Sequence, residues 1–187
     1  MDAKFSLAHI GSLLSARNPI VLWEALAELL QEVPELASHL QLNFIGTTSQ
    51  EVKDTLEKRG LLSYVHDYGY VAHLDAVRFQ KHSQILLLIE IDSPDTKLIL
   101  PGKLFEYLVS GRPILAMGPE GSDFASIISE TQTGAFFRYS QKEEVKAYIL
   151  SCFTAFLAGT LKVSAHGIEK YARKNLTEQL ARLLTKL

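Results

Sequence analysis

Two patterns of apolar residues alternate along this chain: short apolar runs, and longer stretches in which apolar residues recur with helical spacing. Between short apolar runs, apolar positions return every three or four residues, as at Ile20, Trp23 and Leu26, which is the spacing of a helix. The short runs have the length of β-strands and cover residues 5–10, 40–45, 65–71, 84–91, 113–117 and 134–137. The helical stretches cover residues 18–32, 49–58, 74–82, 101–110, 123–130, 141–157 and 165–187.

Two of the runs indicate where their strands lie in a sheet. The strand predicted over residues 84–91 is apolar on consecutive positions from Ile85 to Ile89, which is typical of a parallel strand covered on both faces. Residues 65–71 are more polar, which favours a place nearer an edge.

At the first helix, Asn18 is the predicted cap and Pro19 belongs to the first turn.

Strands that alternate with helices predict βαβ units and a mostly parallel sheet. Because such crossovers are right-handed, we expect a doubly wound, Rossmann-like α/β fold of about six strands flanked by helices, with further helices at the C-terminus. We assign residues 1–187 to a single domain. In such sheets a ligand lies beyond the carboxyl ends of the strands, so the loops that follow each strand are the place to look for chemistry.

Composition narrows the function classes. The formal net charge is -2, which argues against a general nucleic-acid surface. The single cysteine, Cys152, excludes an internal disulfide and disfavours a zinc cluster, so we expect a cytoplasmic location. No apolar run reaches the length of about 18 residues that a membrane span needs. A strand pattern begins almost at once, at Phe5, which favours a domain of a longer chain.

Residues 101–106 combine several features of an anion site. Pro101 is preorganised for a first helical turn, and Gly102 allows an anion to approach the backbone. The N–H groups of Gly102, Lys103 and Leu104 are expected to point at that anion, and Lys103 adds a full charge. Glu106 shares the helix face with Lys103 and is placed to accept hydrogen bonds from a ribose. On spacing alone, a solvated Lys103–Glu106 ion pair is the favoured alternative.

The run from Pro101 to Ala116 resembles the donor-site motif of GT-B glycosyltransferases, closest to the retaining family-4 type. Glu106 matches the second glutamate of that family's Glu-x7-Glu element, and Gly111 and Pro113 match its helix stop and strand start. The resemblance extends from His9 to the final helix and covers the family's C-terminal, donor-binding domain. It implies a nucleotide-diphosphate sugar as substrate, no tightly bound metal and no further cofactor.

The motif departs from the family at two positions. The first glutamate of the pair falls at Leu98, which cannot hydrogen-bond a sugar, so Thr96 or backbone groups would have to substitute. In the first loop, Ser12 replaces the family's first arginine, whereas Arg17 matches its basic second position. The resemblance therefore leaves Arg17 and Lys103 as the cations that hold the diphosphate and act in catalysis. Without the resemblance, a surface residue before a helix is the favoured alternative for Arg17.

Five other residues complete the predicted donor site: Gly11, Ser12, Gly46, Tyr70 and Val71. Gly11 ends the first strand, and Gly46 ends the second, where a tight turn is favoured over contacts with the base. Tyr70 and Val71 match the loop against which the base lies in the family. For Tyr70, packing in the core is the favoured alternative.

Other groups that resemble chemical sites are discounted. Glu90 and Asp92 share one strand face and resemble a cation site, but a solvated pair or a turn cap is favoured. The six histidines are scattered without metal-ligand spacing, and His73 is the one best placed to reach a ligand. Neither a Gly-x-Gly-x-x-Gly fingerprint nor a P-loop occurs in the sequence.

Three functions stay open from the sequence. The first is the donor-binding half of a glycosyltransferase, inactive by itself because the N-terminal acceptor domain is missing, with residues 165–187 as a helix that crosses towards that domain. We expect the apolar stripe of this helix to pack in the core, or to be exposed in part if that domain is missing. Membrane association of such a parent enzyme stays open. The second is a non-catalytic nucleotide-binding or protein-interaction module, which Leu98 and Ser12 favour. The third, a receiver-like signalling domain, is disfavoured because Gly11 and Ser12 stand where it needs acids.

Overall fold

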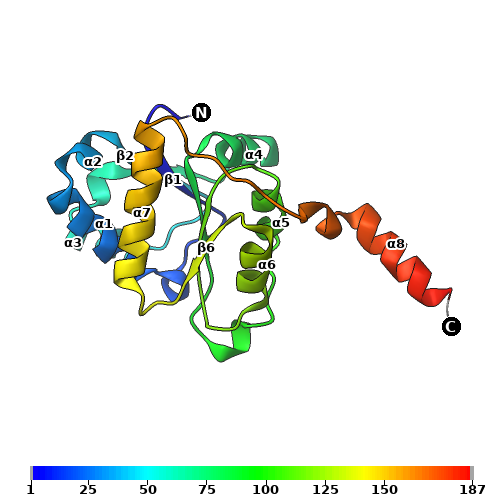
Figure 1. The fold of residues 1–187 in the computed structure, drawn as a ribbon. Helices are drawn as coiled ribbons and strands as arrows, with labels where there is room; N and C mark the ends of the chain where they lie inside the picture. The colour runs from blue at the N-terminus through cyan, green and yellow to red at the C-terminus, as the bar shows by residue number, and fades with distance from the viewer. Residues whose placement is uncertain (1, 186–187) are drawn as a thin grey trace.

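The computed structural model describes residues 2–185 and places one six-stranded sheet between two layers of helices (Figure 1). Neighbouring strands pair in parallel in the order β3-β2-β1-β4-β5-β6. The chain direction across the sheet therefore reverses between β1 and β4, which is the topological switch point of a doubly wound sheet. The strands are β1 (Phe5–Ile10), β2 (Leu40–Ile45), β3 (Val65–Gly69), β4 (Ile85–Ile89), β5 (Ile114–Met117) and β6 (Gly134–Phe137).

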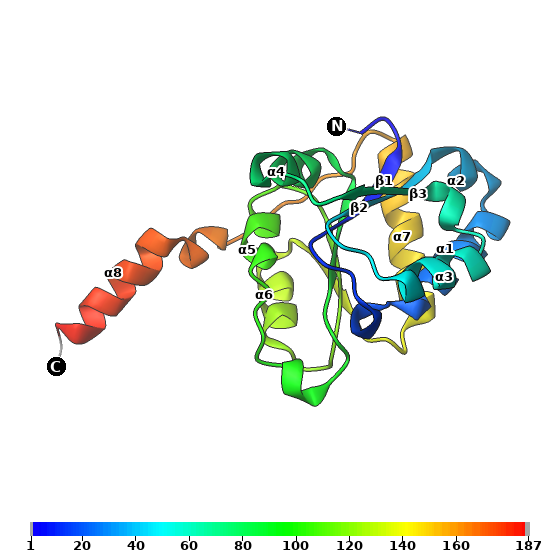
Figure 2. The same cartoon turned by 180° about the vertical axis from the view of Figure 1, so that it is seen from behind.

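The helices divide between the two faces of the sheet (Figures 1 and 2). One face is covered by α1 (Ile20–Glu32), α2 (Pro34–His39), α3 (Gln50–Lys58) and α7 (Lys142–Leu157). The other is covered by α4 (His73–His82), α5 (Lys103–Leu108) and α6 (Asp123–Thr131). Short 3-10 segments occur at η1 (Ser15–Arg17), η2 (Leu62–Tyr64), η3 (Pro94–Thr96) and η4 (Ile168–Tyr171), and α8 (Arg173–Leu184) ends the described chain.

Strand alternation divides the core into two clusters, one on each face. In β1, Phe5 and Leu7 pack into the cluster under α1 and α7, whereas Ala8 and Ile10 pack into the cluster under α5 and α6. Every residue of β1 and of β4 is buried. The consecutive apolar pattern of β4 therefore reflects burial of that strand on both faces, as predicted.

Element boundaries differ from the sequence prediction where tertiary contacts intervene. Pro34 begins α2, a short helix that the pattern did not show. The third strand lies at the sheet edge as predicted, but ends at Gly69 instead of residue 71. Asn18 does not cap α1, because its side chain donates to Thr55 Oγ1 (2.9 Å) and accepts from Trp23 Nε1 (2.9 Å).

The C-terminal segment extends away from the body of the domain (Figures 1 and 2). Sequence analysis predicted one helix over residues 165–187 that packs its apolar stripe into the core. In the structure the helix α8 covers residues 173–184, none of which is buried, and Leu176, Leu180 and Leu183 are exposed. The predicted core packing is wrong for these leucines, whereas Ile168 and Tyr171 do pack against the second core cluster. Residues 186–187 lie outside the described part of the chain.

Gly46 is required by backbone packing between the first two loops. Its φ is +125°, and a Cβ there would lie 2.5 Å from the carbonyl oxygen of Gly11. We expect Gly46→Ala to lower the free energy of unfolding by about 3 kcal/mol, because both the backbone and its neighbour must shift. Urea denaturation measures this. Gly102→Ala is the control, since Gly102 has a φ of -54° and open space around it, and its change should stay within about 1 kcal/mol. An unchanged urea midpoint for Gly46→Ala would contradict the prediction.

Candidate functional site

The predicted anion site forms where α5 meets the carboxyl end of β1. Lys103, the first residue of α5, sends its Nζ across to β1, 2.9 Å from His9 Nε2 and 3.0 Å from the carbonyl oxygen of Ile10. Tyr107, one turn further on, accepts a hydrogen bond from the N–H of Ile10 (3.2 Å). These contacts fix the start of α5 against the end of β1, beside the switch point between β1 and β4.

The electrostatics of Lys103 are unusual for a lysine. Burial of the amine and, to a lesser extent, the charge of Arg17 lower its pKa from 10.5 to about 7, although the charge of Glu90 opposes the shift. His9 is fully buried, and its pKa is lowered well below 6.5 by that burial and then by the charges of Lys103 and Arg17. The imidazole is therefore neutral near pH 7, and its Nε2 is able to accept a hydrogen bond from the lysine amine.

Arg17 does not point freely into the site, because it is bound to Glu90. Glu90 Oε1 accepts from Arg17 Nε (3.1 Å) and lies 2.9 Å from Nη2, while the N–H of Ile91 donates to the same oxygen (2.8 Å). The Glu90 side chain is only 3% exposed, so the predicted solvated pair with Asp92 is wrong for this residue. Glu90 is the residue of the candidate site whose burial and pairing with Arg17 the sequence did not reveal. The available signal was an acid directly after a strand buried on both faces.

Glu106 and Lys103 do not form the ion pair that their spacing allows. Glu106 Oε2 accepts from Gln80 Nε2 (2.6 Å), a buried side chain on α4. Lys103 turns instead to His9 and Ile10. The solvated-pair alternative is therefore wrong, and the two groups occupy separate positions on α5.

The start of α5 differs from the predicted anion cradle. The helix begins at Lys103 instead of Pro101, and the N–H of Leu104 donates to the carbonyl of Pro101 (2.9 Å). The prediction that the N–H of Leu104 is free for an anion is therefore wrong, and its side chain is buried in the core. Gly102 is exposed beside the lysine.

The other predicted donor-site residues lie in the loops at the strand ends. Gly11 and Ser12 are exposed directly after β1, and Gly46 follows β2. Val71 is half-buried against the second core cluster, whereas Tyr70 is 94% exposed. Core packing is therefore wrong for Tyr70, and its ring is accessible.

The loop after β4 shows how the departures from the family motif are accommodated. Leu98 is 80% exposed. The Thr96 hydroxyl, a suggested substitute for the missing glutamate, donates within its own loop to the carbonyls of Ile91 (2.7 Å) and Ser93 (2.9 Å). The Thr96 hydroxyl therefore already has partners within its own loop. At the position of the missing glutamate, the exposed side chain of Leu98 presents an apolar surface.

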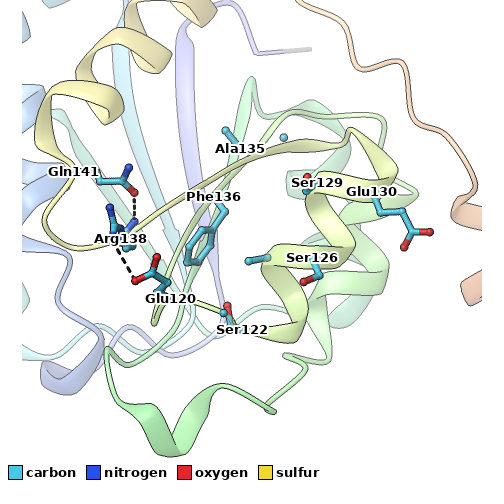
Figure 3. A pocket seen from close by; sticks show the side chains of 12 residues that line it. Glu120, Ser122, Ser126, Ser129, Glu130, Ala135, Phe136, Arg138 and Gln141 are labelled. Atoms are coloured by element: carbon cyan, nitrogen blue, oxygen red, sulfur yellow. Dashed lines mark hydrogen bonds and ion pairs between the residues drawn. The ribbon is translucent and has the colours of Figure 1, made fainter.

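A separate groove of about 780 Å³ runs between α6 and the edge strand β6 (Figure 3). Ser126 and Phe136 line it, and at one end Arg138 pairs with Glu120 (3.2 Å) while its N–H donates to Gln141 Oε1 (2.8 Å). The residues that line this groove include none of the predicted donor-site residues.

Within residues 2–185, no three His, Cys, Asp or Glu side chains gather as metal ligands would. Over the same part of the chain, no helix has both the length and the apolar character that a membrane crossing requires.

The strand order and the parallel pairing define a Rossmann-like domain, and its fold is that of the C-terminal domain of GT-B glycosyltransferases. Neither models of known protein families nor curated protein sequences match the chain. Solved structures do match it. WaaG, a glycosyltransferase involved in lipopolysaccharide biosynthesis, superposes with a TM-score of 0.68 at 18% identity over 86% of this chain and 40% of WaaG.

Two further structures agree. HepE from Anabaena, in complex with UDP-glucose, superposes with a TM-score of 0.68 at 18% identity over 99% of this chain and 50% of HepE. The C-terminal domain of LpcC, a glycosyl transferase group 1 family protein from Francisella tularensis, matches 84% of this chain and 79% of that domain, with a TM-score of 0.60 at 13% identity. At these identities the likeness concerns the fold, and the chain spans half or less of WaaG and HepE.

Proposed function

We propose that this chain is the donor-binding domain of a glycosyltransferase and binds a nucleotide-diphosphate sugar at the carboxyl ends of β1 and β4. The observation that carries the proposal is the Lys103 amine, held at the switch point by His9 and the Ile10 carbonyl. Ligands of doubly wound sheets bind at that point. The likeness in fold to HepE, whose structure contains UDP-glucose, supports a nucleotide-diphosphate sugar as the ligand.

In this proposal each predicted residue has a distinct role. Lys103 stabilises the charge that develops on the departing diphosphate, and Arg17 assists it from its position on Glu90. Glu106 accepts hydrogen bonds from the ribose. The backbone of Gly11, Ser12, Gly46, Pro101 and Gly102 surrounds the nucleotide, and Tyr70 and Val71 face the base.

We propose that a second, acceptor-binding domain completes the enzyme. The chain covers only half of HepE, and the exposed leucines on α8 offer an apolar stripe for that domain. The isolated chain is then expected to bind donor without transferring sugar. A cytoplasmic location, with peripheral membrane association of the complete enzyme, belongs to the same proposal.

A non-catalytic nucleotide-binding module is the second candidate function. The exposed Leu98 favours it, because no carboxylate stands where the transferred sugar needs a partner. This module would bind nucleoside diphosphates and their sugars equally well. A glycosyltransferase domain is instead expected to discriminate between them.

Isothermal titration calorimetry with UDP, ADP and GDP, and with UDP-glucose, ADP-glucose and GDP-mannose, tests the proposal. We expect Glu106→Gln to weaken binding of the preferred nucleotide about tenfold, because a carboxylate is a stronger acceptor for ribose hydroxyls than an amide. A 2′,3′-dideoxy nucleotide should bind wild type and variant alike. Glu57→Gln, on the exposed face of α3, is the matched control. Unchanged affinity in Glu106→Gln would remove the ribose assignment, and binding of no nucleotide at all would contradict the proposed function.

A further inference from the structure

The amine of Lys103 has two of its three hydrogen-bonding directions already filled. One points to His9 Nε2 (2.9 Å) and one to the carbonyl oxygen of Ile10 (3.0 Å). A charged ammonium carries an N–H in the third direction, whereas a neutral amine carries a lone pair there. An anionic oxygen is attracted by the first arrangement and repelled by the second.

The backbone of the loop after β1 passes close to the Lys103 amine. Gly11 has a φ of +107° and no side chain, and a Cβ placed on it would lie 3.8 Å from Lys103 Nζ. At Gly11 the loop therefore presents no side chain to the amine.

The groups that face Lys103 come from three elements: His9 from β1, Arg17 from η1 and Glu90 from the end of β4. Burial lowers the pKa of His9 well below 6.5, the two cations lower it further, and the backbone of Gly11 opposes this with a smaller effect. Arg17 and Glu90 are bound to one another. With its pKa at about 7, Lys103 changes charge near neutral pH.

We propose that His9 is a positioning residue that orients the Lys103 amine, and that the site takes up one proton from solvent, onto Lys103 Nζ, when it binds a nucleotide-diphosphate sugar. The inference rests on the proposed function and adds a coupling between donor binding and pH. A bound diphosphate favours the charged amine, and the His9 and Ile10 acceptors direct its remaining N–H at the ligand.

Calorimetry in two buffers with different ionisation enthalpies, HEPES and Tris, counts the protons. The probes are UDP-glucose, ADP-glucose and GDP-mannose, because a doubly esterified diphosphate does not titrate between pH 6 and pH 9. We expect uptake close to zero at pH 6, where Lys103 is already charged, rising to about one proton at pH 8.

His9→Leu tests the positioning role. Loss of one acceptor to a charged donor should lower the titration midpoint of the Lys103 ¹³Cε resonance in the free protein by about one pH unit. Donor affinity should then fall about tenfold at pH 8 but less than about threefold at pH 6. His9→Gln retains an acceptor and should lie closer to wild type, and His66→Leu, on the exposed edge strand, is the control. Thermal midpoints show whether each variant is folded, and His9→Gln carries the comparison if His9→Leu is not.

The outcomes separate this inference from the proposed function. Binding of none of the three sugar nucleotides to the wild-type chain contradicts the proposed function. Donor binding without proton uptake between pH 6 and pH 9 overturns the coupling and leaves the function standing. A His9→Leu variant with the wild-type midpoint for Lys103 and the wild-type pH profile overturns the positioning role.

Discussion

Replacing Lys103 with methionine should weaken binding of a nucleotide-diphosphate sugar at least about thirtyfold at pH 6, the equivalent of about 2 kcal/mol. The amine is largely shielded from solvent at the end of β1, so water compensates poorly for its loss when an anion binds. Methionine retains the length and the apolar stem of the side chain. Calorimetry at pH 6 measures the effect, because wild-type Lys103 is charged there.

Lys58→Met is the control for the change in net charge, since Lys58 is exposed at the end of α3. Its affinity should equal that of the wild type. Wild-type affinity in Lys103→Met would show that Lys103 does not meet the diphosphate.

The same substitution has an opposite and pH-dependent effect on stability. The pKa of Lys103 falls from 10.5 to about 7 on folding, so the cost of burying its charge is fully present below pH 7 and disappears above pH 10.5. The stability of Lys103→Met relative to wild type should therefore be higher at pH 6 than at pH 10. Weaker binding together with this pH trend distinguishes a lost ligand contact from a damaged fold.

Arg17→Leu should lower the free energy of unfolding by about 3 kcal/mol, because it leaves the Glu90 carboxylate buried without its cation. The Arg17 side chain is itself 32% exposed, so water partly replaces it, and the expected cost lies at the lower end of that for a broken buried pair. For a chain of this length, the thermal midpoint should fall by about 6–12 °C.

A double variant separates the lost ion pair from lost packing. In Arg17→Leu/Glu90→Gln the buried group is neutral, and the glutamine oxygen still accepts from the N–H of Ile91. We expect the double variant to recover most of the lost stability. Arg78→Leu removes an exposed ion pair with Asp75 and should change stability by less than about 0.5 kcal/mol. A double variant no more stable than Arg17→Leu would show that the arginine stabilises the fold by packing.

Sequence patterns predicted the fold well because each helix and strand buries a face whose apolar spacing can be read within that element. The consecutive apolar residues of β4 follow from burial on both faces, and the structure confirms that this strand is fully buried. The same patterns missed α2, whose six residues are too few to show helical periodicity. They also could not show that α8 leaves the domain, because an apolar stripe has the same spacing whether or not a surface covers it.

The candidate site was predicted only in part. The motif around Lys103 and Glu106 identified the residues, and the fold of GT-B glycosyltransferases agrees with the resemblance on which their roles depend. Glu90 was read as a solvated group because nothing nearby in the sequence marks Arg17 as its partner. The ion pair between them joins residues 73 positions apart.

The amino-acid sequence by itself determined the alternation of strands and helices, the strand ends where loops converge, and the Pro101–Glu106 motif. These depend on local spacing and on the burial that each element requires. Only the tertiary structure decided what the charged groups of that motif meet. Lys103 contacts His9, which is 94 positions away in the sequence, and Glu106 accepts a hydrogen bond from Gln80, which is 26 positions away. Helix spacing could not predict these contacts, because it reveals only neighbours three or four residues away. The long-range packing that joins these elements lowers the pKa of Lys103 and so sets the charge of the site near neutral pH.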